Sequence, residues 1–179
     1  FSGHPSPTCF MALRSSFHKF SRKTAGVKVS LNSVMLEKTT SKIALVTGGS
    51  NGIGRAIVKK MANEGIKVVI ADLQKNDAEP KAIFRKCDVS RKEDIAALFS
   101  WMLENTGLPD ILVLNAGRGI KEKLSEGDPE KWEHILNVNI MGALRCIRAF
   151  VPNMLEEKQG QVVFISSVSA NQPHPYGSI

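Results

Sequence analysis

The chain has 179 residues, of which 42% are hydrophobic and 23% are charged, and this composition is typical of one folded domain of ordinary size. No apolar run reaches the roughly 18 to 20 residues of a membrane helix, so no stable membrane span is expected. Of the net charge of +7, residues 1–42 carry +6, which leaves the rest nearly neutral. Because a nucleic-acid-binding domain keeps its basic residues on the fold itself, this distribution argues against a nucleic-acid partner.

Residues 1–41 form a basic leader that is rich in Ser, Lys and Arg and poor in acids. This composition is typical of an organelle transit peptide. A disordered extension, or translated sequence upstream of a start at Met11 or Met35, is the alternative interpretation. We expect a cytoplasmic protein, or a mitochondrial or plastid one if the leader is a targeting signal.

The three cysteines are Cys9, Cys87 and Cys146, which are far apart and form no Cys-x-x-Cys pair. Two of them lie in apolar segments, where a free cysteine behaves as a small hydrophobic residue. Neither a disulfide framework nor a metal site is expected from this spacing.

From Lys42 onward, short apolar runs alternate with segments of helical periodicity. The predicted strands are 42–49, 66–73, 82–89, 110–117 and 160–167. The predicted helices are 52–64, a second opened by a capping box of Ser90 and Glu93, and a third that starts at Asp128-Pro129, ends near Lys158 and bends near Gly142. Most of the strands are continuously apolar, which is typical of a parallel sheet covered on both faces. The sequence therefore predicts an α/β fold with a doubly wound parallel sheet and five strands present.

A glycine-rich segment, TGGSNGIG, joins the first strand to the first helix. Gly48, Gly52 and Gly54 allow the backbone to approach a pyrophosphate closely, and the amides at the helix start stabilise its negative charge. A plain tight turn is the alternative, but the strand–turn–helix context favours a dinucleotide site.

The second strand ends at Asp72, 18 residues after Gly54. A carboxylate there can accept hydrogen bonds from the adenosine ribose hydroxyls and would repel a 2′-phosphate, so NAD is predicted over NADP. Asn51, which precedes Gly52, carries no positive charge and agrees with NAD. Arg55 keeps NADP as the alternative.

These features, together with Asp88-Val89, the NAG segment at 115–117, Asn139 and the ISS segment at 165–167, resemble the short-chain dehydrogenase/reductase family over residues 42–179. The resemblance implies a Rossmann fold and hydride transfer between NAD(P) and a secondary alcohol or ketone. It also implies the cofactor-binding residues, which are Gly48, Ser50, Asn51, Gly52, Ile53 and Gly54 at the pyrophosphate, Asp72 and Leu73 at the ribose, Asp88 and Val89 at the adenine, and Asn115, Ala116 and Gly117 under the cofactor.

Two catalytic residues follow from the same resemblance. Asn139 shares a predicted helical face with Trp132, Ile135 and Leu136, and an amide there needs partners because an unsatisfied buried polar group costs about 1 to 3 kcal/mol. It either pins two backbone segments or holds a water in the family's proton relay, and both roles are compatible. Ser167, with Ala170 at the family's usual glycine position, would hydrogen-bond the substrate oxygen.

The resemblance also implies a Tyr-x-x-x-Lys pair that acts as general acid and base. Tyr176, the only tyrosine, lies nine residues after Ser167 in a Pro- and Gly-rich stretch, closer than the family spacing allows. That spacing places the tyrosine directly after Ile179. We therefore expect a Rossmann domain at 42–179 that is incomplete at its C-terminus, with an inactive, poorly soluble chain and an enzymatically active, homo-oligomeric full-length parent. The alternative is a non-catalytic, regulatory NAD-binding protein.

Overall fold

The structure is a computed structural model that describes residues 41–75, 81–123 and 125–167. Tyr176, Ala170 and all but the last residue of the predicted leader lie outside these ranges. Along the described chain the elements are β1 (Ile43–Thr47), α1 (Gly52–Asn63), β2 (Lys67–Asp72), β3 (Ile83–Lys86), α2 (Lys92–Asn105), β4 (Ile111–Leu114), α3 (Pro129–Leu136), the π-helical turn η1 (Asn137–Met141), α4 (Gly142–Glu156) and β5 (Gln161–Phe164).

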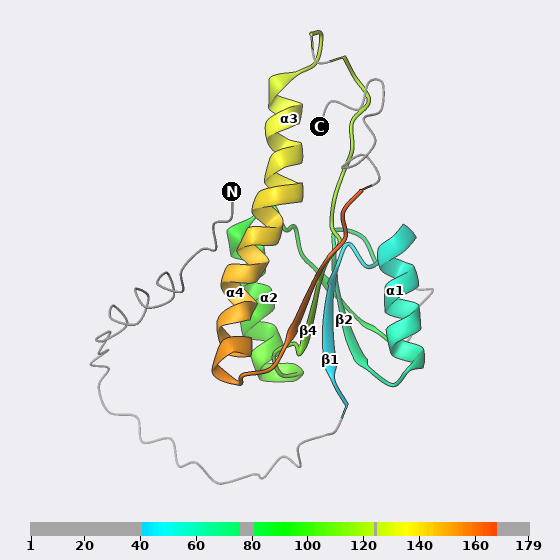
Figure 1. Cartoon of the computed structure of the whole chain (residues 1–179), viewed down its shortest axis with the longest axis vertical. Helices are drawn as coiled ribbons and strands as arrows, with labels where there is room; N and C mark the ends of the chain where they lie inside the picture. The colour runs from blue at the N-terminus through cyan, green and yellow to red at the C-terminus, as the bar shows by residue number, and fades with distance from the viewer. Residues whose placement is uncertain (1–40, 76–80, 124, 168–179) are drawn as a thin grey trace, which may run out of the picture. The chain divides into compact units, whose positions relative to one another are not determined.

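The five strands form one parallel sheet in the order β3-β2-β1-β4-β5 (Figure 1). The central strand β1 pairs with both β2 and β4, so that Ala44 lies opposite Val68 on one side and Ile111 on the other. This arrangement confirms the predicted doubly wound, Rossmann-like sheet. The carboxyl ends of the strands therefore meet along one edge, where such sheets bind ligands.

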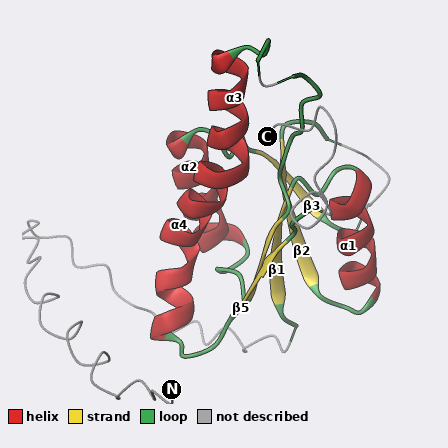
Figure 2. Ribbon diagram, turned by 45° about the horizontal axis from the view of Figure 1, so that its top comes forward, coloured by secondary structure: helices red, strands yellow, loops and turns green. Residues whose placement is uncertain are grey.

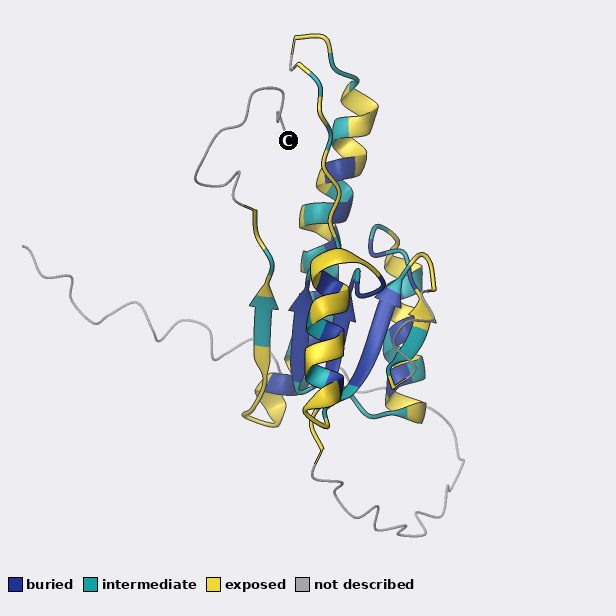
Figure 3. Ribbon diagram, turned by 90° about the vertical axis from the view of Figure 1, so that its right-hand side faces the viewer, coloured by how far each residue is buried: buried dark blue, intermediate teal, exposed yellow. Residues whose placement is uncertain are grey.

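Helices cover both faces of the sheet, which explains why its strands are apolar throughout (Figures 1 and 2). On one face, α2 and α4 pack onto residues such as Leu45, with Phe150 of α4 fully buried. On the other face, Val58 of α1 packs against Val46. The edge strand β5 is less buried than the inner strands (Figure 3). Phe164 at its end is 59% exposed.

The longest helical stretch runs through α3, η1 and α4. It begins as predicted, because the Asp128 side chain accepts a hydrogen bond from Glu130 N at 3.0 Å and Pro129 occupies the first turn. Where the sequence predicts a bend, the structure has the π-helical turn, which closes with a hydrogen bond from Gly142 N to Asn137 O. Within the described residues, this stretch (Pro129–Glu156) is the one helix that is long and apolar enough, by length and composition alone, to cross a membrane. Its buried face packs on the sheet, and a core helix meets the same criteria.

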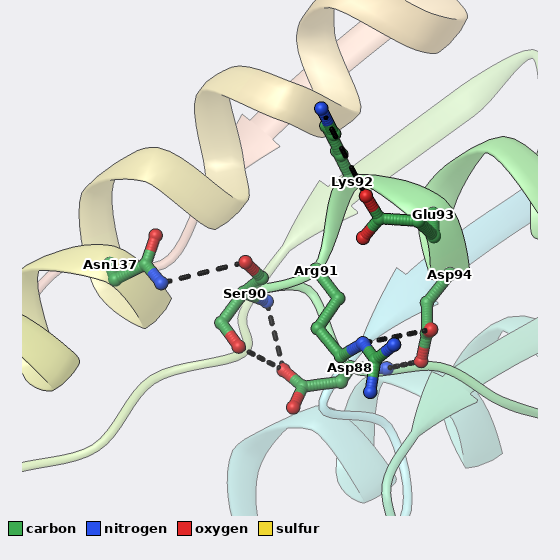
Figure 4. Close-up of polar contacts among 7 residues, drawn as sticks. All are labelled: Asp88, Ser90, Arg91, Lys92, Glu93, Asp94 and Asn137. Atoms are coloured by element: carbon green, nitrogen blue, oxygen red, sulfur yellow. Dashed lines mark hydrogen bonds and ion pairs between the residues drawn. The ribbon is translucent and has the colours of Figure 1, made fainter.

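The predicted capping box at the start of α2 is wrong. The helix begins one residue later than that pairing requires, so Arg91 occupies the N-cap position and makes no capping hydrogen bond through its side chain. Ser90 instead donates to Asp88 Oδ1, from its hydroxyl at 2.6 Å and from its backbone N at 2.9 Å (Figure 4). Asp94, rather than Glu93, reaches back and accepts from Asp88 N at 2.9 Å.

Candidate functional site

The glycine loop leaves β1 in a conformation that favours glycine. Gly48 has a φ of 65°, and its N donates to Ala71 O at 2.8 Å, which ties the loop to β2. Gly52, the first residue of α1, has a φ of 53°, and apart from its neighbours along the helix no atom of the described residues lies within 4 Å of the place where its Cβ would be. The loop is thus strained for other residues at two positions, and open space lies beside Gly52.

Gly54 is required for a different reason, which is close packing. A Cβ at this position would collide with Gly48 O and with the side-chain nitrogen of Asn115. That nitrogen donates to Thr47 O at 3.0 Å and to Gly48 O at 2.9 Å. The Asn115 side chain therefore holds the glycine loop in place through these two hydrogen bonds. This structural role adds to its predicted place under the cofactor.

Thr47 is a site residue that the sequence interpretation missed. Its side chain is buried, and its hydroxyl accepts from Asn115 N at 3.0 Å and from Ala116 N at 3.1 Å while donating to Val113 O at 3.3 Å. The hydroxyl thus joins the carboxyl ends of β1 and β4, which are 66 or more residues apart in sequence. A buried polar residue at the last position of an apolar strand was the signal that could have identified it.

The residues around α1 fit a dinucleotide pyrophosphate. The first turn of α1 contains no acidic residue, and no side-chain hydrogen bond caps the helix at Asn51, so the helix start can receive an anion. Ile53 is 63% exposed in this turn and lines the neighbouring cleft. The open space beside Gly52 lies at the same helix end, so these residues fit a nicotinamide dinucleotide.

Asp72 lies at the carboxyl end of β2 and contacts the glycine loop directly. Its Oδ2 accepts from Ser50 N at 3.0 Å, and its Oδ1 accepts from Gln74 N at 3.3 Å. Leu73 follows with 50% of its surface exposed. A carboxylate oxygen has more than one lone pair, so Asp72 can hold the loop and still accept a ribose hydroxyl.

Asp88 and Val89, which were predicted to flank the adenine, lie in different environments. Burial disfavours the Asp88 carboxylate, but the hydrogen bonds from Ser90 and the nearby charges of His134 and Arg91 outweigh that penalty and lower the pKa of Asp88. Val89 is buried and lines the cleft, where it lies close to Gly142. Asp88 therefore stabilises the connection between β3 and α2, while Val89 contributes cleft surface.

Asn139 lies within the π-helical turn and holds the chain that follows β4. Its Oδ1 accepts from Arg118 N at 2.8 Å, and its Nδ2 donates to Arg118 O at 2.8 Å. This pair of bonds is the structural role that was predicted for the amide. π-Helical turns are frequent at functional sites, and this one places Asn139 beside Gly117, whose Cβ position is 3.4 Å from Asn139 Oδ1.

A cleft of about 890 Å³ lies at the carboxyl ends of the central strands. Such a volume suits a ligand of cofactor or drug size. The cleft brings together these predicted site residues: Ile53, Val89, Asn115, Ala116, Gly117, Asn139 and Ser167. The other predicted residues, which do not line it, are Gly48, Ser50, Asn51, Gly52, Gly54, Asp72, Leu73 and Asp88. Most of these lie at the start of α1 and the end of β2, next to the cleft along the same sheet edge.

Fold and site together define a Rossmann-type protein with a cleft at the carboxyl ends of its strands. The family model for short chain dehydrogenases matches residues 42–179, so the chain belongs to the short-chain dehydrogenase family. The family typically binds a nicotinamide cofactor.

Relatives of known sequence agree with this assignment. An uncharacterized oxidoreductase of Staphylococcus saprophyticus is 37% identical over 139 residues, which cover 72% of this chain and 59% of the relative. An uncharacterized oxidoreductase of Listeria monocytogenes is 32% identical over 149 residues, which cover 78% and 60%. The crystal structure of a short-chain dehydrogenase from Streptomyces avermitilis superimposes with a TM-score of 0.72 at 30% identity, over 76% of this chain and 53% of that one. The chain thus spans about 60% of the length of these curated relatives.

Proposed function

We propose that the protein is an oxidoreductase that transfers a hydride between NAD(P) and a secondary alcohol or ketone. The observation that carries the proposal is the cleft, which joins the nucleotide-binding edge of the sheet to Asn139 and Ser167. The nicotinamide ring, when bound, supplies or accepts the hydride. The chain's own residues bind the cofactor, orient the substrate and hold protons in place.

The cofactor-binding residues act through backbone groups and one carboxylate. The amides at the start of α1 bind the pyrophosphate, and Gly52 leaves room for its close approach. Asp72 accepts the ribose hydroxyls. Ala116 and Gly117 are small, so they leave cleft volume for the ring itself.

The substrate-binding residues lie at the other end of the cleft. Ser167 would donate a hydrogen bond to the substrate oxygen and stabilise the charge that develops there. Asn139 fixes the backbone of Arg118 through both of its side-chain groups, and its Oδ1 has a second lone pair that can accept a water of the proton relay.

The preference for NAD over NADP rests on the negative charge of Asp72. The variant Asp72→Asn removes the charge but keeps an oxygen that can accept from Ser50 N. We expect the ratio of the NADP to the NAD dissociation constant to fall by roughly tenfold or more, since a charge repulsion is lost. Titration of both cofactors measures this ratio. An unchanged ratio would assign Asp72 to loop support alone.

The transfer itself is tested with the full-length protein and NADH that carries deuterium on its nicotinamide ring. Incubation with a panel of ketones should place deuterium on the new alcohol carbon, and Ser167→Ala should lower the rate while cofactor binding stays. Saturable NADH binding with no label in any product would favour the alternative, a non-catalytic NAD-binding protein.

A further inference from the structure

The wall of the cleft that follows β4 carries two cations and no acidic residue. Arg118 and Lys121 both line the cleft, and its 19 lining residues include no Asp or Glu. Among the described residues, neither cation takes part in an ion pair. The cleft is therefore a place where the field favours an anion.

The other charged residues of this loop are already engaged. Glu122 Oε1 accepts from Trp132 Nε1 at 2.6 Å. Lys123 Nζ lies 2.9 Å from Glu126 Oε1. Neither Glu122 nor Glu126 lines the cleft, so Arg118 and Lys121 are the charged residues of its lining.

Arg118 is also the better positioned of the two cations. Asn139 holds its backbone through two hydrogen bonds of 2.8 Å, and Arg118 Nη1 lies 3.4 Å from His134 Nε2. A guanidinium whose backbone is fixed in this way loses less freedom on binding than one on an unattached loop. Its planar set of donors matches the two oxygens of a carboxylate or phosphate.

The remaining surface near these cations is largely apolar. Ile120, Ile140 and Phe164 line the cleft, and Ile140 and Phe164 are more than half exposed. A carbon skeleton can cover these side chains while an anionic group contacts Arg118 and Lys121.

We propose that the substrate of this site is a ketone or secondary alcohol that also carries an anionic group, a carboxylate or a phosphate, bound by Arg118 and Lys121. The inference rests on the proposed function and adds the substrate class to it. The pyrophosphate of the cofactor has its own donors at the start of α1, so the two cations act on the substrate.

The first test compares matched substrates in the full-length protein. Oxo acids and phosphorylated ketones are each paired with a neutral analogue, the methyl ester or the free alcohol. We expect kcat/KM to favour the anion, and Arg118→Gln combined with Lys121→Gln to reduce that preference by roughly tenfold or more, mainly through KM. Lys123→Gln is the matched control, because its amine pairs with Glu126 and does not line the cleft; it should leave the preference unchanged.

The second test measures binding without turnover. Malonate should bind the NAD-loaded protein more tightly than neutral malonamide, and the double variant should lose that difference, as measured by calorimetry. Equal binding of malonate and malonamide to the unaltered protein would overturn the inference, as would a double variant that weakens acids and esters equally.

The inference would also be overturned if the Arg118→Gln and Lys121→Gln double variant raised the NAD dissociation constant and left the KM for the anion unchanged. In that case the two cations would bind the cofactor rather than the substrate. Failure of the proposed function has a different signature, which is absence of NAD(H) binding in a folded protein. In that case malonate and malonamide binding are compared in the protein without cofactor.

Discussion

The hydroxyl of Thr47 makes three hydrogen bonds that join the carboxyl ends of β1 and β4. Sequence patterns predicted the glycines and Asn115 because each belongs to a recognisable segment. They did not identify Thr47, since a threonine at a strand end is compatible with packing alone. Likewise, the spacing of Ser90 and Glu93 predicted a capping box, but it could not show that Asp88 binds the Ser90 amide and hydroxyl while Asp94 accepts from Asp88 N.

Thr47→Val keeps the shape of the side chain and removes its hydroxyl. Two backbone amides lose their acceptor, so we expect the free energy of unfolding to fall by about 2 to 4 kcal/mol. Thr47→Ser, which keeps the hydroxyl and loses a methyl group, should cost about 1 kcal/mol. Urea unfolding of both variants measures the difference. Equal losses in the two variants would show that packing, rather than the hydroxyl, makes Thr47 important.

Ser90→Ala removes the 2.6 Å hydrogen bond that helps to lower the pKa of Asp88 below its ordinary value of 3.8. A carboxylate with a lowered folded-state pKa stabilises the protein above its ordinary pKa, and this contribution is lost as the pH falls through the lowered value. The cost of Ser90→Ala should therefore be constant between about pH 7 and pH 5 and shrink as the pH falls below about 4.

Unfolding measured across this pH range tests the prediction, with Ser100→Ala on the exposed face of α2 as the control. A cost that does not change with pH would show that the Ser90 hydroxyl does not act through the Asp88 carboxylate.

At the scale of elements, the π-helical turn decides how the long helix meets the site. Helical periodicity predicted the helix and its Asp128 start, but its buried face runs through Ile135 and Val138, while Asn139 turns to the backbone of Arg118. One extra residue in a turn shifts every later side chain around the helix, and apolar spacing alone does not reveal such a shift.

Gly142 ends the π-helical turn, and its backbone packs closely against Val89. An alanine at this position tests how tightly the helix and Val89 are packed. A Cβ there would lie 2.8 Å from Val89 Cγ2 and 3.2 Å from Val89 O. In an open helix, Gly→Ala adds stability of about 1 kcal/mol. Here we expect Gly142→Ala to destabilise by about 1 to 3 kcal/mol, because Val89 is packed in the core.

Gly119→Ala is the control, since in the described part of the chain no atom other than those of its two neighbours lies within 4 Å of its Cβ position. Thermal unfolding of both variants gives the comparison. A Gly142→Ala variant as stable as the original would show that α4 can move away from Val89 at no cost.

For the whole molecule, the sequence predicted the parallel sheet and the edge at which the site lies. Continuous apolar strands such as β1 and β2 are typical of a parallel sheet covered on both faces, and the structure has this arrangement. Side-chain directions are set by tertiary contacts, and these were beyond prediction: Asp72 accepts from the amide of Ser50, and Asn139 binds the backbone of Arg118.

The central claim is that the glycine loop binds a nicotinamide dinucleotide, and an NADH titration of the folded protein beside its Gly54→Ala variant tests it most directly. The added Cβ collides with Gly48 O and the Asn115 side chain, so the loop must shift. We predict saturable binding to the unaltered protein and to Ser100→Ala on the exposed face of α2, and a loss on the order of tenfold or more for Gly54→Ala. A folded protein that does not bind NADH, or a Gly54→Ala variant that binds it as tightly as Ser100→Ala does, would contradict the account.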